Sequence, residues 1–175
     1  MQGLSLGVRN LRTELIRADH AAAVFPYLCD SRLYTYIDGA QPSSVAALEA
    51  RFLRWAQGCS DPAEQWCNWI SFDGEQPIGT LQATIRERCA ILGYVVFRPF
   101  WGRGLATAGC RWLVQELFTT YRVQQVYAFV DARNLASMGV AQAAGLRKLA
   151  LHESPAELPA TDIAFTAQAC ASQTS

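Results

Sequence analysis

The chain has 175 residues, 51% of them hydrophobic, and its 15 basic residues balance its 15 acidic residues. We therefore expect a single domain over residues 1–175, with a core over about residues 8–168. The zero net charge excludes a broad electrostatic surface for nucleic acid or membrane. With no export signal and no apolar stretch long enough to span a bilayer, we expect a cytoplasmic protein.

The first third of the chain predicts one strand followed by two helices. Alternating polar and apolar residues over 9–16 indicate the strand, and a helix is expected to follow and to end at residue 28. The apolar run at 33–37 is ambiguous between helix and strand. Pro42-Ser43-Ser44 is typical of a helix start, which predicts an amphipathic helix over residues 45–57.

The rest of the chain is dominated by strands. Asp73-Gly74 is a hairpin signal, and it joins strands expected at 66–72 and 77–86. A third strand is expected at 89–97. There follow, in order, a helix at 104–119, a strand at 124–131, a helix at 135–144 and a last pair of strands at 146–152 and 162–168. The order β-α-α-β-β-β-α-β-α-β-β makes this an α/β protein.

The six cysteines stand apart, without a C-x-x-C pair, and the chain has only two histidines, His20 and His152. A structural zinc site needs clustered Cys and His ligands, so we expect no metal. The thiols are expected to be reduced and to act mostly as small core residues.

Two glycines separated by one residue follow the strand expected at 89–97, in the stretch Phe97-Arg98-Pro99-Phe100-Trp101-Gly102-Arg103-Gly104-Leu105-Ala106-Thr107. Glycine adopts the backbone conformations of a tight turn at little cost, and such a turn leaves amide N–H groups free. The helix expected to begin near Gly104 adds the partial positive charge of its dipole. The junction therefore predicts a pyrophosphate-binding loop, to which Arg103 adds a cation.

Two other phosphate-binding motifs do not fit this loop. A dinucleotide fingerprint needs glycine at position 107, where Thr107 stands, and a Walker A loop needs a lysine, whereas the only lysine is Lys148. The pattern from Trp101 to Ala106 resembles the acetyl-CoA pyrophosphate loop of the GNAT N-acetyltransferase superfamily, Gln/Arg-x-x-Gly-x-Gly/Ala. Trp101 replaces the usual Gln or Arg, as is common in the ribosomal-protein alanine/serine N-acetyltransferase branch. On the loop alone, a glycine-rich turn that binds nothing is the alternative.

A second motif supports the same resemblance. Asn134 and Ser137 begin a short amphipathic helix that ends at Gly145-Leu146. The same branch carries Asn-x-x-Ser, seven further residues and Gly-Phe/Leu, and this chain matches those intervals without gaps. Two motifs in order are more specific than either one. Ordinary helix capping by Asn134 and Ser137 remains an alternative, compatible interpretation.

The resemblance implies a mixed, mostly antiparallel sheet that splays between its fourth and fifth strands, with helices on both faces. The pantetheine arm of acetyl-CoA would lie in the splay and pair with the fourth strand, and the loop would bind the pyrophosphate. No metal would be needed. Carried over residue by residue, the cofactor contacts fall on Tyr94, Val95, Val96, Trp101, Gly102, Arg103, Gly104, Leu105, Ala106, Thr107 and Asn134.

The chemistry implied is attack of a neutral amine on the thioester, which needs a base, an oxyanion donor and an acid for the departing thiolate. A free N–H of Val95 or Val96 is the expected oxyanion donor, and Ser137 is the candidate acid. Many relatives carry the base as a glutamate where this chain has Ile91. Glu87 is a weak candidate base; others are Asp131, His152 and Glu153, and proton loss to water is the default.

The acceptor is named only by elimination. In the family the first two helices and their loop shape the acceptor pocket, so Tyr34, Tyr36 and Trp69 are expected to line it, although core packing is the commoner fate of such residues. A peptide or protein N-terminal amine fits best, transferred directly in a ternary complex by a monomer or homodimer. The alternatives are a small-molecule amine acetyltransferase and a non-catalytic acyl-CoA sensor.

Overall fold

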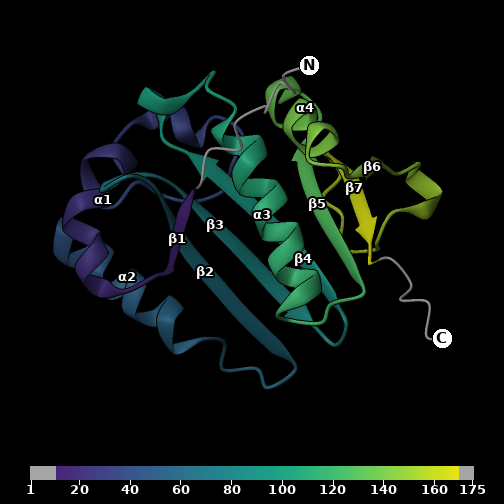
Figure 1. The fold of residues 1–175 in the computed structure, drawn as a ribbon, viewed down its shortest axis with the longest axis horizontal. Coiled ribbons are helices and arrows are strands. Elements are labelled where there is room, and N and C mark those ends of the chain that lie inside the picture. Colours follow the sequence, from purple (N-terminus) through teal and green to yellow (C-terminus); the bar gives the residue numbers. More distant parts are fainter. Residues whose placement is uncertain (1–10, 170–175) are drawn as a thin grey trace, which may run out of the picture.

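The computed structural model describes residues 11–169, which form one seven-stranded sheet in the order β1-β2-β3-β4-β5-β7-β6 (Figure 1). Neighbouring strands are antiparallel except for the parallel pair β4–β5. The mixed α/β fold expected from the sequence is confirmed. The strands are β1 (Arg12–Leu15), β2 (Glu64–Asp73), β3 (Gln76–Arg86), β4 (Cys89–Val96), β5 (Gln125–Asp131), β6 (Arg147–Lys148) and β7 (Asp162–Gln168).

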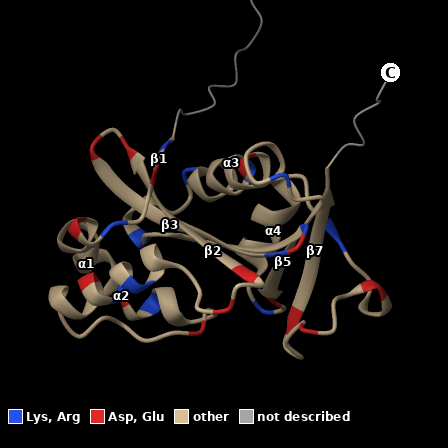
Figure 2. Cartoon of the chain, turned by 90° about the horizontal axis from the view of Figure 1, so that it is seen from below, with Lys and Arg blue, Asp and Glu red and all other residues tan. Residues whose placement is uncertain are grey.

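Helices cover both faces of the sheet (Figure 2), and they are α1 (Ala21–Leu28), α2 (Val45–Gln57), α3 (Leu105–Thr119) and α4 (Leu135–Ala143). The buried side chains of α3 pack with alternate residues of β2 to β5 into one core, which includes Leu81, Leu92 and Val126. A second core lies under α1 and α2 and contains Phe52, Ile70 and Phe97. No helix within residues 11–169 is long and apolar enough to cross a membrane.

Three local expectations need correction. The ambiguous run at 33–37 is only partly helical: a 3-10 helix spans Ser31–Tyr34, where the Asp30 side chain accepts the Arg32 N–H, and residues 35–37 form neither helix nor strand. β1 begins at Arg12, and residues 9 and 10 of the expected strand lie outside the described part of the chain. The expected strand at 146–152 is reduced to the two residues of β6, because the chain turns at Leu151–Glu153, where the Glu153 carboxylate accepts the Ala150 N–H.

The sheet opens between β4 and β5. Their parallel pairing begins at Cys89 and Gln125 and ends at Leu92 and Ala128, although both strands continue. On its other side β4 stays paired with β3 as far as Val96 and Gly79. The last four residues of β4, 93–96, therefore have backbone partners on one side only, and the splay that the resemblance implies is present.

A buried aromatic residue fixes the end of β4 next to this opening. Phe97 is fully buried, and its ring stacks on Tyr27 with 5.1 Å between the ring centroids. Its N–H donates to the carbonyl of Ile78, which precedes Gly79 on β3, at 2.8 Å. The chain that follows is thereby held at a defined position, and it is the glycine-rich loop.

Candidate active site

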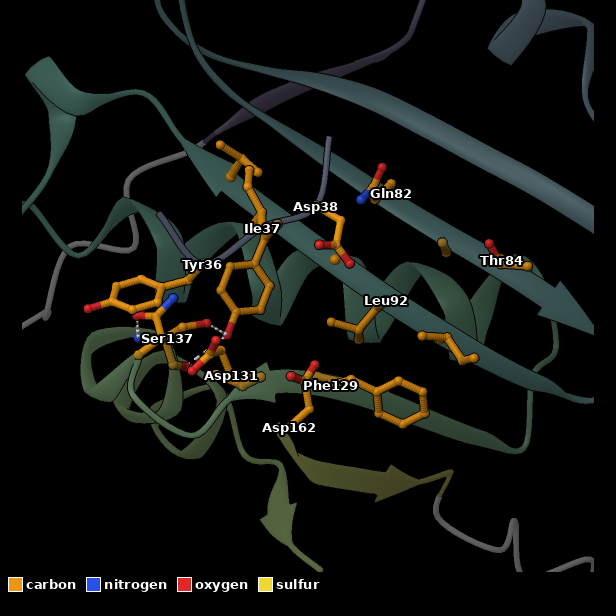
Figure 3. Close-up of a pocket in the computed structure, with 18 of the residues that line it drawn as sticks. Tyr36, Ile37, Asp38, Gln82, Thr84, Leu92, Phe129, Asp131, Ser137 and Asp162 are labelled. Carbon is orange, nitrogen blue, oxygen red and sulfur yellow. Dashed lines mark hydrogen bonds between the residues drawn. The ribbon is translucent and has the colours of Figure 1, made fainter. Parts of the chain in front are cut away.

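Two cavities meet at the opening between β4 and β5. The loop cavity, of about 740 Å³, lies against the glycine-rich loop and the start of α3. The sheet cavity, of about 490 Å³, lies over β3, β4 and β5 beneath the chain at 36–38 (Figure 3). The side chains or backbone that line both cavities, and so mark their junction, belong to Tyr36, Ile37, Tyr94, Val95, Asn134 and Ser137.

The loop presents main-chain amides to the loop cavity. Gly102 and Gly104 have positive φ angles of 74° and 73°, which residues other than glycine adopt only with strain. The Ala108 N–H donates to the Gly104 carbonyl at 3.0 Å as the first hydrogen bond of α3. The amides of residues 105–107 precede it, so they have no acceptor within the helix. Together with the helix dipole they form an anion-binding arrangement on the cavity wall.

Trp101 ties this loop to the end of β4. Its indole N–H donates to the Val96 carbonyl at 2.6 Å, while the side chain remains 52% exposed. The expected cofactor residues all line the loop cavity except Arg103, whose guanidinium lies over the Phe100 ring at 5.6 Å from the centroid. Arg103 therefore stands at the side of the loop rather than on the cavity wall.

The backbone of β4 presents alternate N–H groups to the opening. Phe97 donates its N–H towards β3, and in an antiparallel pair successive residues point their N–H groups to opposite sides. The N–H groups of Val96 and Tyr94 therefore point into the opening, and that of Val95 points to β3. The Val96 carbonyl, which accepts the Trp101 indole, lies on the same open side.

Ser137 is held at the junction by two neighbours. Its N–H donates to Asn134 Oδ1 at 3.1 Å, so Asn134 caps α4, in agreement with the capping interpretation of the sequence. From β4, the Tyr94 hydroxyl donates to the Ser137 carbonyl at 2.9 Å and lies 3.0 Å from Ser137 Oγ. Burial raises the pKa of Tyr94 far above its ordinary value, so this hydroxyl keeps its proton.

Aromatic rings and carboxylates share the wall of the sheet cavity. The aromatic residues are Tyr36, Trp55, Trp66, Tyr94 and Phe129, and the carboxylates are those of Asp38, Asp131 and Asp162. No Lys or Arg among residues 11–169 lines this cavity. On its described wall the loop cavity has one charged side chain, Arg32, and its guanidinium forms an ion pair with Asp30 at 2.8 Å.

The three carboxylates differ in their partners. Asp131 accepts from the Arg133 guanidinium at 2.9 and 2.6 Å, and these hydrogen bonds lower the pKa of Asp131 to about 2. Asp162 accepts from the Thr161 hydroxyl at 3.0 Å. Within the described chain Asp38 has no such hydrogen bond or ion pair, and Figure 3 shows its carboxylate pointing into the sheet cavity.

Gly93 makes room for a further polar group at the point where β4 and β5 part. A Cβ atom at this position would come within 2.9 Å of Gln82 Nε2 on the neighbouring strand β3. The bare backbone of Gly93 therefore lets the Gln82 amide lie over β4, on the wall of the sheet cavity. Ile91 lines the same cavity, so the site at which many relatives carry a glutamate is apolar here.

The structure separates the residues expected to line the acceptor pocket. Tyr36 lines both cavities, but Tyr34 lines neither and donates its hydroxyl to the Leu28 carbonyl at 2.9 Å. Trp69 is 4% exposed and packs edge-on against Trp112 in the α3 core. Side chains alternate along β2, so Trp66 faces the cavity and Trp69 faces α3. The period-2 pattern was visible in the sequence, but it did not show which set faced the cavity.

Glu87 precedes β4, at the end of the strand that lies away from the junction of the two cavities. It occupies the turn between β3 and β4, with a positive φ of 52°, and lines neither cavity. Asp38, Asp162 and Gln82 were not expected at the site. Asp38 belongs to the irregular segment after the ambiguous run, and nothing in its sequence neighbourhood indicated its position. Within residues 11–169 no three His, Cys, Asp or Glu side chains gather in a way that suits a metal ion.

This sequence and this fold are similar to those of known proteins. Residues 10–147 match the family model of the acetyltransferase (GNAT) domain. Similar solved structures include a ribosomal-protein-S5-alanine acetyltransferase from Vibrio fischeri, 17% identical, covering 95% of this chain and 97% of that one with a TM-score of 0.74. A ribosomal L7/L12 alpha-N-protein acetyltransferase in complex with coenzyme A is 14% identical, with coverage of 93% and 97% and a TM-score of 0.76. An aminoglycoside acetyltransferase in complex with coenzyme A is 17% identical, with coverage of 91% and 95% and a TM-score of 0.73. At these low sequence identities, the similarity to the three solved structures is a similarity of fold alone.

Proposed function

This chain belongs to the GNAT acetyltransferase family, and from that premise we propose that it moves the acetyl group of acetyl-CoA to the primary amine of a protein or peptide N-terminus, directly and in a ternary complex. The observation that carries the proposal is that two cavities meet at the opening between β4 and β5: one is lined by the first amides of α3 and the other by carboxylates and aromatic rings. One suits a phosphate-bearing cofactor and the other a cationic acceptor. Their shared wall is where thioester and amine would meet.

Acetyl-CoA would enter from the loop cavity. Its pyrophosphate would accept hydrogen bonds from the amides of residues 105–107, at the positive end of α3. Its pantetheine arm would continue along the open edge of β4, where the N–H groups of Val96 and Tyr94 point into the opening. The thioester would then lie at the junction of the two cavities, beside Ser137.

The oxyanion and the leaving group would each have a donor at this junction. Tyr94 lines both cavities, whereas Val96 lines only the loop cavity, so we assign the oxyanion contact to the Tyr94 N–H. The sequence suggested the N–H of Val95 or Val96 as the oxyanion donor. The Val95 N–H is excluded because it points to β3, and we prefer Tyr94, two residues before Val96. Ser137 Oγ, at the same junction, would protonate the departing thiolate.

The acceptor would arrive through the sheet cavity as an ammonium. Carboxylates attract a cation into the cavity, and aromatic faces add cation–π contacts. Asp131 is a poor base because its partner Arg133 holds its pKa at about 2. We assign Asp38 to bind the ammonium and to receive its proton through water, since its carboxylate points into the cavity.

Asp38→Asn is expected to lower kcat/KM for the amine about 10-fold, the lower end of the range for one lost hydrogen bond to a charged group. The KM for acetyl-CoA should change less than about twofold, because Asp38 lines only the sheet cavity. Thiol release at varied amine concentration measures the first constant, and thiol release at varied acetyl-CoA concentration measures the second. Glu75→Gln, at a fully exposed carboxylate in the β2–β3 hairpin, is the matched control. Equal losses in the two variants, or no loss in Asp38→Asn, would contradict the assignment.

A small-molecule amine is the second candidate acceptor. The carboxylate-rich wall of the sheet cavity would suit a polycation, and an aminoglycoside acetyltransferase is among the similar structures. Thiol release from acetyl-CoA with a panel of short peptides, aminoglycosides and polyamines separates the two. Turnover with free peptide N-termini and not with peptides blocked at that amine supports our proposal. Turnover confined to aminoglycosides or polyamines would replace it with the second candidate.

A further inference from the structure

We propose that the Tyr94 hydroxyl is a positioning group for acetyl transfer, acting through Ser137 by holding its side chain at the junction of the two cavities. The inference rests on the function proposed above. It differs from the role that the sequence suggested for Tyr94, which concerned the backbone of β4 alone. The hydroxyl is a side-chain group that reaches a different element, 43 residues further along the chain.

Tyr94 bridges the sheet where backbone pairing has ended. The last paired residues of β4 and β5 are Leu92 and Ala128, and Tyr94 lies two residues beyond that point. Its ring packs against the core under α3, and its hydroxyl reaches the first turn of α4. A side-chain hydrogen bond therefore spans the opening in place of a ladder of backbone hydrogen bonds.

Ser137 is fixed through three of its atoms. Its N–H donates to Asn134 Oδ1 at 3.1 Å, its carbonyl accepts from the Tyr94 hydroxyl at 2.9 Å, and its Oγ lies 3.0 Å from the Tyr94 oxygen. Tyr94 has one proton, and when this proton is given to the carbonyl the phenol oxygen remains an acceptor. The Ser137 O–H can then donate to that oxygen in the resting enzyme, which sets its rotamer before the acyl donor binds.

The proton balance leaves Tyr94 unchanged. The amine nitrogen forms the C–N bond, the C–S bond breaks and its electron pair goes to sulfur. The thiolate takes the Ser137 proton, which is replaced by one of the two protons that the ammonium loses; the second is released to solvent. Because burial raises the pKa of Tyr94, its hydroxyl remains protonated and continues to hold Ser137. It is a positioning residue rather than the acid.

Tyr94→Phe keeps the ring and the N–H of β4 and removes only this hydroxyl. We expect kcat to fall about 10-fold, because an acid that is present but misplaced protonates the departing thiolate more slowly. The KM for acetyl-CoA should stay within about twofold of the wild-type value, since the main-chain contacts remain. Tyr34→Phe is the matched control: it also removes a hydroxyl bonded to a carbonyl, but it lines neither cavity. Thermal unfolding of both variants checks the fold.

A double-mutant cycle with Ser137→Ala separates positioning from a structural effect. If Tyr94 acts through the Ser137 hydroxyl, Tyr94→Phe should change kcat by less than about twofold in the Ser137→Ala background. An equal loss in both backgrounds, or an unchanged kcat in Tyr94→Phe alone, would overturn the inference. Absence of turnover by the wild-type enzyme with every amine tested would contradict the proposed function instead, so the two failures are distinguishable.

Discussion

Gly104→Val is expected to lower the affinity for acetyl-CoA by at least about 100-fold while the protein remains folded. Gly104 has a φ of 73°, where a β-branched residue is strained by about 1–3 kcal/mol. The chain relieves that strain by moving, and the amides of residues 105–107 then leave the geometry that suits a pyrophosphate. A Cβ at this position meets no atom within 4 Å, so the loss comes from the backbone and not from a clash.

Gly58→Val is the control for this experiment. Gly58 also has a positive φ, 83°, and a Cβ there would likewise meet no atom within 4 Å, but it ends α2 and lines neither cavity. Isothermal titration calorimetry with acetyl-CoA measures the two dissociation constants, and thermal unfolding measures the cost to the fold. Similar affinities in both variants would show that the loop does not bind the cofactor.

Ser137→Ala is expected to lower kcat about 100-fold, at the low end of the range for general acid catalysis. The thiolate would then leave without a proton donor at the junction. The dissociation constant of acetyl-CoA should be unchanged, because α4 keeps its cap: the bond to Asn134 uses the backbone N–H of residue 137, which alanine retains. The loss should therefore be confined to the chemical step.

Ser154→Ala is the matched control, since its hydroxyl donates to the Ala150 carbonyl at 3.0 Å and lies outside both cavities. Single-turnover measurement of thiol release isolates the chemical step from binding and product release. A wild-type rate in Ser137→Ala would remove Ser137 from the mechanism, and a fall in acetyl-CoA affinity alone would give it a binding role.

The elements that carry strong local signals were predictable from the sequence. The helix over residues 45–57 and the strand–loop–helix order around Gly102 and Gly104 are confirmed, because apolar periodicity, a serine cap and paired glycines act within a few residues. The loop cavity, which we propose to be the cofactor side of the site, follows from these elements. Its residues are mostly consecutive in the chain, so a short motif specifies most of them.

The sheet cavity, which we propose to be the acceptor side, depends on contacts between distant residues. Which face of β2 meets the cavity was decided by packing against α3, and this put Trp66 rather than Trp69 on the wall. The hydroxyl contact between Tyr94 and Ser137 joins two elements that no local pattern relates. Asp38 reaches the cavity from irregular chain. Such positions follow from the tertiary fold, which periodicity and propensity do not determine.

The most direct test of the account is an amide NMR titration of the wild-type protein, first with pantetheine and then with coenzyme A. We expect both ligands to shift the amide signals of Tyr94 and Val96, and only coenzyme A, which carries the pyrophosphate, to shift those of residues 102–107. Saturating shifts at residues 102–107 with coenzyme A alone would support main-chain recognition of the diphosphate. Shifts confined to other parts of the chain, or none at all, would contradict it.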